Sequence, residues 1–331
     1  MHYAGIDLHR TTLMVAIETD SGPIGKPRQL YCKDIQGISQ HFEKLQPFRA
    51  VVEASSSYRW LYDLLSPLGE VILAHPRRLK AIVDGRAKTD KLDAALLAKL
   101  LRVDLIPQAY VPPQSYASLR EITRARARLS RHQGDAKREL QMLLAQRNVH
   151  VPVKSAFCQR WCRYVSQQDF GPHGNAARDE IFKRIAHYQK ELVVMDRTLE
   201  GLASDFPEVE ALLPIRGIGL YTALLIVAEI GEPWRFQNGR QVGAYAGLTA
   251  RVSQSGDHCF YGNISKQGSK WLRWSLGQVA MKVLPGDPEL KRFYTRIRKR
   301  SNWKVARTAV ARKLACICWK RLMDWHNEQA A

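Results

Sequence analysis

The sequence predicts an α/β domain at the N-terminus, a helical coiled-coil arm after it and a mostly α-helical C-terminal domain. Three observations lead to this prediction. Short β-rich runs alternate with amphipathic segments in the first third, heptad-like spacing follows, and glycine-rich turns then separate apolar helices. By length alone, 331 residues fit about two domains. The residue pattern changes twice along the chain, and these changes predict domains at 1–110, 111–206 and 207–331.

The composition points to a polyanionic partner. Lys and Arg number 51 against 31 Asp and Glu, which gives a formal net charge of +20. Such an excess is hard to explain for an enzyme of small neutral metabolites. No apolar run approaches a membrane span and the start has no signal-peptide pattern, so we expect a cytoplasmic, nucleoid-associated protein without a membrane partner. The six cysteines are too scattered for a disulfide framework or a zinc ribbon, which indicates reduced thiols.

The N-terminal domain begins with two β-rich runs, 3–7 and 12–17, separated by a polar turn that suggests a hairpin. Short apolar runs at 50–53 and 71–74 have the pattern of buried strands, and a plausible helix precedes each. These elements predict a small domain built around a central sheet.

A helix is predicted at 90–102, where Thr89 can cap the first turn. Its expected apolar stripe consists of Leu92, Leu96, Leu97 and Leu100.

Four acidic residues occupy the places where these elements end or begin. Asp7 ends the first strand, Glu53 ends a central strand, and Asp90 and Asp93 lie three residues apart on one helix face. Carboxylates that converge at strand ends repel one another unless cations neutralise them, and hard oxygen ligands suit Mg²⁺ or Mn²⁺. Two such ions can clamp the attacking and leaving oxygens of a phosphoryl transfer. For each acid alone, a cap or a turn is the plain alternative.

This order of acids is the layout of the RNase H-like fold in its RuvC-like variant. Sugar and acetate kinases share that fold, and residues 5–12 could pass for their phosphate-binding turn. The chain lacks a second phosphate-binding repeat, however, and its net charge of +20 opposes a kinase.

Two long helices are predicted in the middle of the chain. The first, within 114–149, has apolar residues at helical spacing and an opposite face rich in arginine. The second has steps of four and three over three heptads, as a coiled-coil seam requires. The seam residues are Ile181, Ile185, Tyr188, Leu192, Met195, Leu199 and Leu202. We interpret the pair as an antiparallel arm for spacing or self-association; a merely solvated arginine face remains the alternative.

The C-terminal domain opens with 213–219, followed by an apolar helix at 220–230. Gly217 and Gly219 resemble one half of a helix-hairpin-helix, in which backbone N–H groups approach a phosphate. A glycine-rich turn between helices is the alternative reading. Short strands bracketed by glycines are expected after residue 238, and then a helix at 269–283.

A run of basic residues closes the chain. Residues 291–321 hold 12 Lys and Arg and no acid, with Phe293, Trp303 and Trp319 interleaved, whereas a solvated surface normally mixes signs. We expect nucleic-acid contacts on this run, on the arm helix and near the glycine turns. The candidate residues are Arg120, Arg124, Arg128, Arg131, Gly217, Gly219, Lys266, Lys270, Arg273, Arg298, Lys299, Arg300, Lys304 and Arg307.

Six motifs are distributed in order over nearly the whole chain: YAGIDLH, VVEASSSY, KTDKLDAALLAKLL, LLPIRGIG, AYAGLTARVSQSG and NISKQGSKWLRWSL. In order and approximate spacing they resemble the insertion-sequence transposases of the IS-one-ten type, a group that includes a pilin-gene DNA invertase. The resemblance implies a RuvC-like domain with an Asp-Glu-Asp-Asp metal set, which falls on Asp7, Glu53, Asp90 and Asp93.

The resemblance also implies a nucleophilic serine in a Ser-Gly step, which falls on Ser255. This serine would attack a scissile phosphate and form a phosphoserine link, assisted by Mg²⁺. The implied partners are donor and target DNA, a non-coding bridge RNA and further copies of the chain as a dimer or tetramer. Ser253, Ser265 and Tyr261 are less favoured alternatives for the nucleophile.

One departure from the family pattern is that 54–58 reads Ala-Ser-Ser-Ser-Tyr, where relatives have Ala-Thr-Gly-x-Tyr. Loss of the glycine can alter the turn beside the metal site but leaves Glu53 intact. Two competing functions also remain open. One is a RuvC-like nuclease that uses water, and the other is a catalytically inactive nucleic-acid-binding protein.

Overall fold

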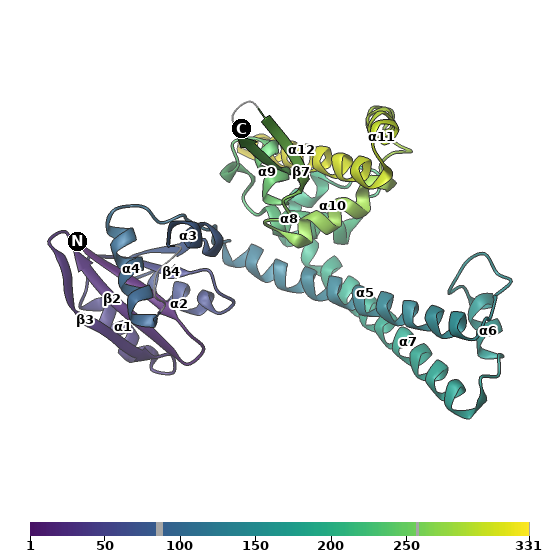
Figure 1. The fold of residues 1–331 in the computed structure, drawn as a ribbon, viewed down its shortest axis with the longest axis horizontal. Coiled ribbons are helices and arrows are strands. Elements are labelled where there is room, and N and C mark those ends of the chain that lie inside the picture. The colour runs from purple at the N-terminus through teal and green to yellow at the C-terminus, as the bar shows by residue number, and fades with distance from the viewer. Residues whose placement is uncertain (84–88, 256–257, 331) are drawn as a thin grey trace. The chain divides into compact units, whose positions relative to one another are not determined.

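The computed structural model describes residues 1–83, 89–255 and 258–330. The chain folds as two compact units, Met1–Val111 and Pro112–Ala331. Figure 1 shows the sheet of the first unit and the helices of the second. In the described ranges, no helix combines the length and the apolar character needed to cross a membrane.

The N-terminal unit is built on one five-stranded sheet with the order β3-β2-β1-β4-β5. The first three strands form an antiparallel meander, and β4 and β5 run parallel to β1. The strands are β1 (His2–Leu8), β2 (Thr12–Thr19), β3 (Gly22–Tyr31), β4 (Phe48–Glu53) and β5 (Glu70–Ala74). The predicted hairpin and both buried strands are confirmed, whereas β3 was not predicted.

Helices cover both faces of this sheet. On one face α1 (Ile35–Glu43) and α2 (Tyr58–Leu65) bury Phe42 and Leu61 against Ile6 of β1. On the other face α3 (Pro76–Val83) and α4 (Asp90–Arg102) pack against β1, β2, β4 and β5. This division follows from the alternation of side chains along each strand.

The start of α4 is confirmed at Asp90, and the side chain of Thr89 caps it by accepting from Leu92 N. The predicted leucine stripe is wrong at Leu92, which is 53% exposed. The buried face of α4 instead includes Ala94 and Ala98, which are fully buried. The helix approaches β1 so closely that only small residues fit between them.

Gly5 explains this close approach. A Cβ atom on Gly5 would lie 2.1 Å from the Ala94 carbonyl oxygen and 2.3 Å from the Ala98 nitrogen. Since both neighbours are backbone atoms, no side-chain rotation can relieve the clash. Glycine at this position therefore allows the segment of α4 from Ala94 to Ala98 to lie directly over β1.

In the C-terminal unit two long helices lie along each other, with a short helix near one end (Figure 1). These are α5 (Gln114–Gln146), α6 (Gln159–Ser166) and α7 (Gly171–Leu202). The predicted seam residues Ile181, Leu192 and Leu199 are buried. Ile181 packs in a cluster with Leu140 and Trp161, which belong to α5 and α6 of the same chain.

The rest of the C-terminal unit surrounds α8, whose residues from Ala223 onward are all buried. Helix α12 packs against α9, α10 and α11, while α8 packs against α5 and α10. The α-helices are α8 (Leu220–Ile230), α9 (Gly239–Tyr245), α10 (Lys270–Lys282), α11 (Pro288–Arg300) and α12 (Trp303–Ala330). The short 3-10 helices are η1 (Ala203–Asp205), η2 (Pro207–Ala211) and η3 (Pro233–Arg235).

Two strands, β6 (Ala250–Ser255) and β7 (His258–Ile264), form a separate antiparallel hairpin. The predicted bounds of α8 and the start of α10 are confirmed. The region after Asn238 is less irregular than expected, because the Asn238 side chain caps α9 by accepting from Gln241 N.

Candidate active site

Two of the acids predicted from the sequence, Asp7 and Glu53, lie at or next to the ends of β1 and β4. The two parallel strands pair as far as Ile6 and Val52, so Asp7 and Glu53 are the next residues on each. The Asp7 side chain is 20% exposed, and Glu53 is an exposed residue. Residues at the ends of neighbouring parallel strands lie at the same edge of a sheet.

Helix α4 brings two more acids to this edge. Asp90 and Asp93 are in its first turn, and the part of the helix that follows, from Ala94 to Ala98, lies directly against Gly5. Both carboxylates act electrostatically on Asp7, two residues along the strand from Gly5. The packing of α4 on β1 therefore brings Asp90 and Asp93 near Asp7.

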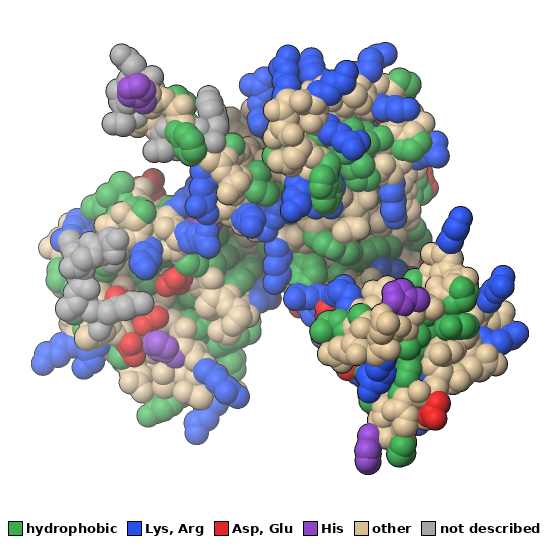
Figure 2. Space-filling model, turned by 45° about the vertical axis from the view of Figure 1, so that its right-hand side comes forward, with side chains coloured by type: hydrophobic (Ala, Val, Ile, Leu, Met, Phe, Trp, Pro, Cys, Tyr) green, Lys and Arg blue, Asp and Glu red, His purple; other side chains and the backbone are tan. Residues whose placement is uncertain are grey.

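A histidine lies among these acids. The Nε2 atom of His9 is 3.2 Å from an Asp7 carboxylate oxygen and 3.3 Å from one of Asp90. Ligand atoms of the three residues all lie within 4.8 Å of one another. In Figure 2, acidic and histidine side chains are neighbours on the visible face of this unit.

The electrostatics of Asp7 favour a bound cation. Burial raises the pKa of the Asp7 carboxyl above its ordinary value, and the charges of Asp90 and Asp93 raise it further, while His9 opposes the shift. Ionised Asp7 is thus disfavoured by its surroundings, and a divalent ion would offset both the burial and the repulsion. The donor set of carboxylate oxygens and one imidazole nitrogen suits such an ion.

His9 was not among the residues predicted from the sequence. Its signal was available, since it follows Asp7 by two residues in the turn between the first two strands. The sequence indicates a polar connection, or a kinase-like phosphate-binding turn over residues 5–12, because spacing alone does not show that His9 lies near the start of α4.

The predicted serine lies in the hairpin of the C-terminal unit. Ser255 is the last residue of β6, and its backbone pairs with His258 at the start of β7. The side chains of Ser253, Ser255 and Tyr261, together with Gly256 and Asp257, fall outside the described part of the structure.

The base of this hairpin is held firmly. Ser265 N donates to the Thr249 carbonyl at 2.8 Å, and Ser269 N donates to the Tyr245 carbonyl at 2.8 Å. Gly268 has a φ of +101°, and a Cβ there would lie 2.1 Å from the Tyr245 oxygen. Glycine is required at this crossing by both its conformation and its space.

The Ser269 hydroxyl connects the hairpin base to the interior. It donates to a carboxylate oxygen of Glu229 at 2.8 Å and accepts from Leu272 N, which caps α10. Glu229 is fully buried in α8, and Arg124 of α5 donates to both of its oxygens, at 2.7 and 3.0 Å. One buried carboxylate therefore links α5, α8 and the start of α10.

Some predicted nucleic-acid contacts have partners inside the protein. Arg120 is buried and donates to the carbonyls of Ala228 and Glu229 at 2.6 and 2.9 Å. Arg124 is paired with Glu229, and Arg273 donates to the Ala246 carbonyl at 2.7 Å. These three arginines therefore hold elements of the unit together through internal hydrogen bonds.

The other predicted basic residues are more accessible. Arg128, Lys266 and Lys270 are exposed, and so is Arg131, which lies 4.0 Å from Asp135. Figure 2 shows many Lys and Arg side chains on the surface of the C-terminal unit.

One group of basic residues, the basic corner, lies where α11 ends and α12 begins. Its cations are exposed except Arg307, which is half-buried, and they lie beside a half-exposed indole. The Asn302 side chain accepts from the backbone N–H groups of Lys304 and Val305 in the first turn of α12. The basic corner consists of Arg298, Lys299, Arg300, Trp303, Lys304 and Arg307.

The predicted glycine turn precedes α8 as expected. Gly219 is the N-cap residue in an extended conformation, and Gly217 has a φ of +90°. A Cβ on Gly217 would lie 2.6 Å from the Cβ of Lys282, so Gly217 packs against the end of α10. The element before the turn is the 3-10 helix η2, where a helix-hairpin-helix would have an α-helix.

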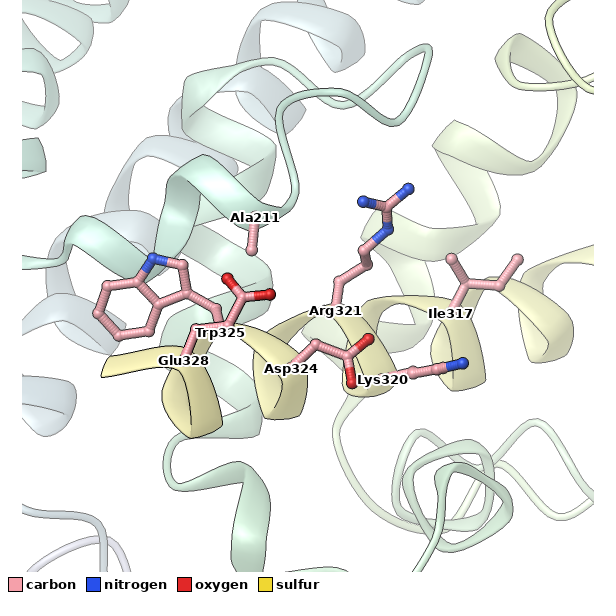
Figure 3. A pocket seen from close by; sticks show the side chains of 7 residues that line it. All are labelled: Ala211, Ile317, Lys320, Arg321, Asp324, Trp325 and Glu328. Atoms are coloured by element: carbon pink, nitrogen blue, oxygen red, sulfur yellow. The ribbon is translucent and has the colours of Figure 1, made fainter. Parts of the chain in front are cut away.

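A cavity of about 440 Å³ lies along the C-terminal half of α12. Figure 3 shows Asp324 and Glu328 among Lys320 and Arg321 on its wall, with Trp325 at one side. Because its charges are mixed, it does not have the character of a polyanion site.

Comparison with known families agrees with this geometry. Residues 4–148 match the DEDD transposase domain of IS110 elements, and residues 209–295 match the family described as Transposase IS116/IS110/IS902. The first match contains all four carboxylates, and the second contains Ser255.

Individual relatives cover most of the chain. A protein of Sinorhizobium fredii named as a transposase is 25% identical over 96% of this chain and 78% of its own length. The transposase for insertion sequence element IS1533 of Leptospira borgpetersenii is 26% identical over 72% of each chain. The pilin gene-inverting protein of Moraxella lacunata is 24% identical over 96% of this chain and 94% of its own.

Proposed function

This chain belongs to the IS116/IS110/IS902 family of transposases, and we propose that it breaks and rejoins DNA strands as the recombinase of an insertion sequence. The observation that carries the proposal is the convergence of Asp7, His9 and Asp90 at the sheet edge where β1 ends. In this proposal, Asp93 and Glu53 would complete the acidic set.

The N-terminal unit is proposed to be an RNase H-like domain of the RuvC-like kind. The support is the strand order β3-β2-β1-β4-β5, with an antiparallel meander and two parallel strands, together with acids at the ends of β1 and β4. The match to a DEDD transposase domain over 4–148 supports the same conclusion.

Asp7, Glu53, Asp90 and Asp93 would hold the metal, Mg²⁺ or Mn²⁺. Bound there, such an ion stabilises negative charge on a phosphate undergoing transfer. The chain's own contribution is to hold the carboxylates in place by strand register and by the Gly5–α4 contact.

Ser255 is proposed as the nucleophile. Its Oγ would form a bond to the scissile phosphorus while the bond from phosphorus to one deoxyribose oxygen breaks, and the hydroxyl proton ends on that leaving oxygen. Reversal with a different sugar hydroxyl rejoins the strand and returns the proton to Ser255. A covalent link conserves the phosphodiester bond energy, so resealing needs no nucleotide cofactor.

The basic corner is proposed as a nucleic-acid surface. Its cations can pair with phosphates, and Trp303 offers a face on which a base can stack. We also propose that a non-coding bridge RNA guides target choice; the support for this is the family membership and the exposed basic surface. Any polyanion is attracted to such a surface, so RNA must be identified directly.

Self-association into a dimer or tetramer is proposed through the arm. The buried seam of α7 is already used within the chain, so a second copy would have to contact other residues. Exposed apolar side chains on the long helices include Met142 and Val194.

Denaturing gels of labelled DNA test the chemistry. The protein is incubated with DNA carrying the ends of its element and Mg²⁺, and we expect joined products and a covalent protein–DNA species. Ser255→Ala should abolish the covalent species, whereas the matched controls Ser253→Ala and Ser265→Ala should keep it. Free DNA ends without an adduct would instead indicate a nuclease that uses water, and binding without any product an inactive DNA-binding protein.

Sequencing of the nucleic acid that purifies with the protein tests guidance. One structured RNA encoded beside the gene, enriched over bulk RNA, would support the bridge-RNA proposal. Random fragments that dissociate in salt would contradict it and leave a recombinase that finds its sites by protein contacts.

A further inference from the structure

We propose that His9 is a nitrogen ligand of the catalytic metal, which makes this centre a mixed nitrogen and oxygen site with a preference for Mn²⁺ over Mg²⁺. The inference rests on the proposed metal centre at Asp7 and Asp90, and it adds a residue outside the four-carboxylate set. It follows from the placement of one atom, the His9 Nε2.

The turn after β1 fixes where this imidazole lies. His9 N donates to the Thr12 carbonyl at 2.9 Å, which closes the turn between β1 and β2. Cys32, the residue after β3, also donates from its backbone N to the Thr11 carbonyl at 3.0 Å, which adds a second backbone contact to this turn. These hydrogen bonds fix the backbone of the turn that carries His9, directly after the end of β1.

The ring nitrogen meets carboxylates from two different elements. Nε2 lies 3.2 Å from Asp7 at the end of β1 and 3.3 Å from Asp90 at the start of α4. A histidine that merely balanced charge on the surface would need only one of these partners. The His9 side chain is about half exposed, so solvent and ions reach it.

An ion pair alone does not account well for this arrangement. An imidazole nitrogen has a single in-plane hydrogen or lone pair, so Nε2 cannot make two linear hydrogen bonds at once. A cation held by both carboxylates would satisfy all three groups, because neutral imidazole then offers its lone pair to the ion. Asp7 would also gain a favourable charge in place of the repulsion from Asp90 and Asp93.

The ligand set determines which metal is preferred. Mg²⁺ favours oxygen donors and keeps much of its water shell, whereas a site with an imidazole binds first-row transition ions more tightly. We therefore expect the intact protein to bind Mn²⁺ more tightly than Mg²⁺, with His9 responsible for a large part of the difference.

Metal binding by the full chain without DNA tests this inference. Mn²⁺ affinity is measured by titration calorimetry, Mg²⁺ affinity by competition against Mn²⁺, and nitrogen coordination by the ¹⁴N coupling in pulsed Mn²⁺ electron paramagnetic resonance. The variants are His9→Ala and the matched control His2→Ala. His2 lies at the opposite end of β1, where its Nδ1 contacts the Leu45 carbonyl.

We expect His9→Ala to weaken Mn²⁺ binding by about tenfold or more, in line with the loss of groups that support a metal site. The ¹⁴N signal should vanish, Mg²⁺ binding should change much less, and added imidazole should restore part of the Mn²⁺ affinity. His2→Ala should bind both ions as the unaltered protein does.

Two results would overturn the inference. If His9→Ala bound Mn²⁺ as tightly or more tightly, His9 would be a counterion that the metal displaces. If the ¹⁴N signal were absent from the unaltered protein with bound Mn²⁺, coordination would be by oxygen alone. The variant Asp7→Asn tests the metal centre itself. It should lose all binding of divalent ions whether or not His9 is a ligand, so retained binding in this variant would mean that the metal centre is not at Asp7.

Discussion

Arg124 holds the fully buried carboxylate of Glu229 through two hydrogen bonds, at 2.7 and 3.0 Å. The arginine comes from α5 and the glutamate from α8, more than a hundred residues later in the chain. Because Ser269 also donates to Glu229, the pair connects the long helix to the base of the serine hairpin. A basic residue that looks suited to nucleic acid in the sequence is a structural residue in the fold.

Removing one partner of this pair should destabilise the protein strongly. Arg124→Ala leaves Glu229 buried without its cation, and losses of this kind cost about 3–5 kcal/mol. Denaturant unfolding measures the effect. The double variant Arg124→Met with Glu229→Leu should be less unstable than Arg124→Ala, since no charge is then buried alone. Arg128→Ala, at an exposed position on the same helix, should change stability by less than about 0.5 kcal/mol.

Gly5 should not tolerate a side chain. Gly5→Val forces α4 away from β1, because a Cβ would lie 2.1 Å from a backbone oxygen. We expect a loss of about 1–3 kcal/mol or more in stability, together with weaker metal binding as Asp90 moves away from Asp7. Gly201→Ala in α7 is the control, since nothing lies within 4 Å of its Cβ. Unaltered metal affinity in a folded Gly5→Val protein would show that the contact does not position the acids.

Asp7→Asn should stabilise the protein in EDTA at neutral pH. Burial raises the pKa of Asp7, so its contribution to stability is present below the ordinary value of 3.8 and is lost as the pH rises through the raised pKa. The difference in unfolding free energy between the variant and the unaltered protein should therefore shrink toward acidic pH. With a divalent ion present, the unaltered protein should become the more stable of the two. An ion concentration of a hundred times the dissociation constant stabilises a protein that binds it by about 2.7 kcal/mol, and Asp7→Asn should not bind it.

The cysteines should differ sharply in reactivity. Full burial raises the pKa of Cys318 to about 12, whereas Cys259 in β7 is exposed. Iodoacetamide should label Cys259 in the native protein and reach Cys318 only after unfolding, because the thiolate is the reactive form. Mass spectrometry of the labelled peptides gives the order, and early labelling of Cys318 would mean that α12 opens readily.

The basic corner should bind through phosphate contacts. Lys304→Ala is expected to weaken binding to single-stranded nucleic acid of any sequence. The slope of the logarithm of the binding constant against the logarithm of the salt concentration should fall in magnitude by about one. Lys313→Ala is the matched control on the same helix, because Lys313 is already paired with Glu289 at 3.0 Å. Equal losses in both variants would indicate a diffuse charge effect in place of a defined contact.

Local sequence signals determined much of the N-terminal unit. The capping threonine predicted the start of α4 at Asp90, and short β-rich or apolar runs identified β1, β2, β4 and β5. Strand β3 escaped prediction because it lies at the sheet edge with most of its residues exposed, so it lacks an apolar pattern. Edge strands are specified by pairing with a neighbour, and pairing is not visible in composition.

The sequence by itself determined that four acids lie at strand and helix ends and that the chain carries a large positive charge. Only the tertiary structure decided which basic residues are available: Arg124 pairs internally, whereas Lys304 stays exposed. It also decided that His9 meets Asp7 and Asp90, since that contact depends on how closely α4 packs on Gly5. The periodicity of a sequence shows on which face of its own helix or strand a side chain lies. The distances between side chains of different elements depend on how those elements pack across the core.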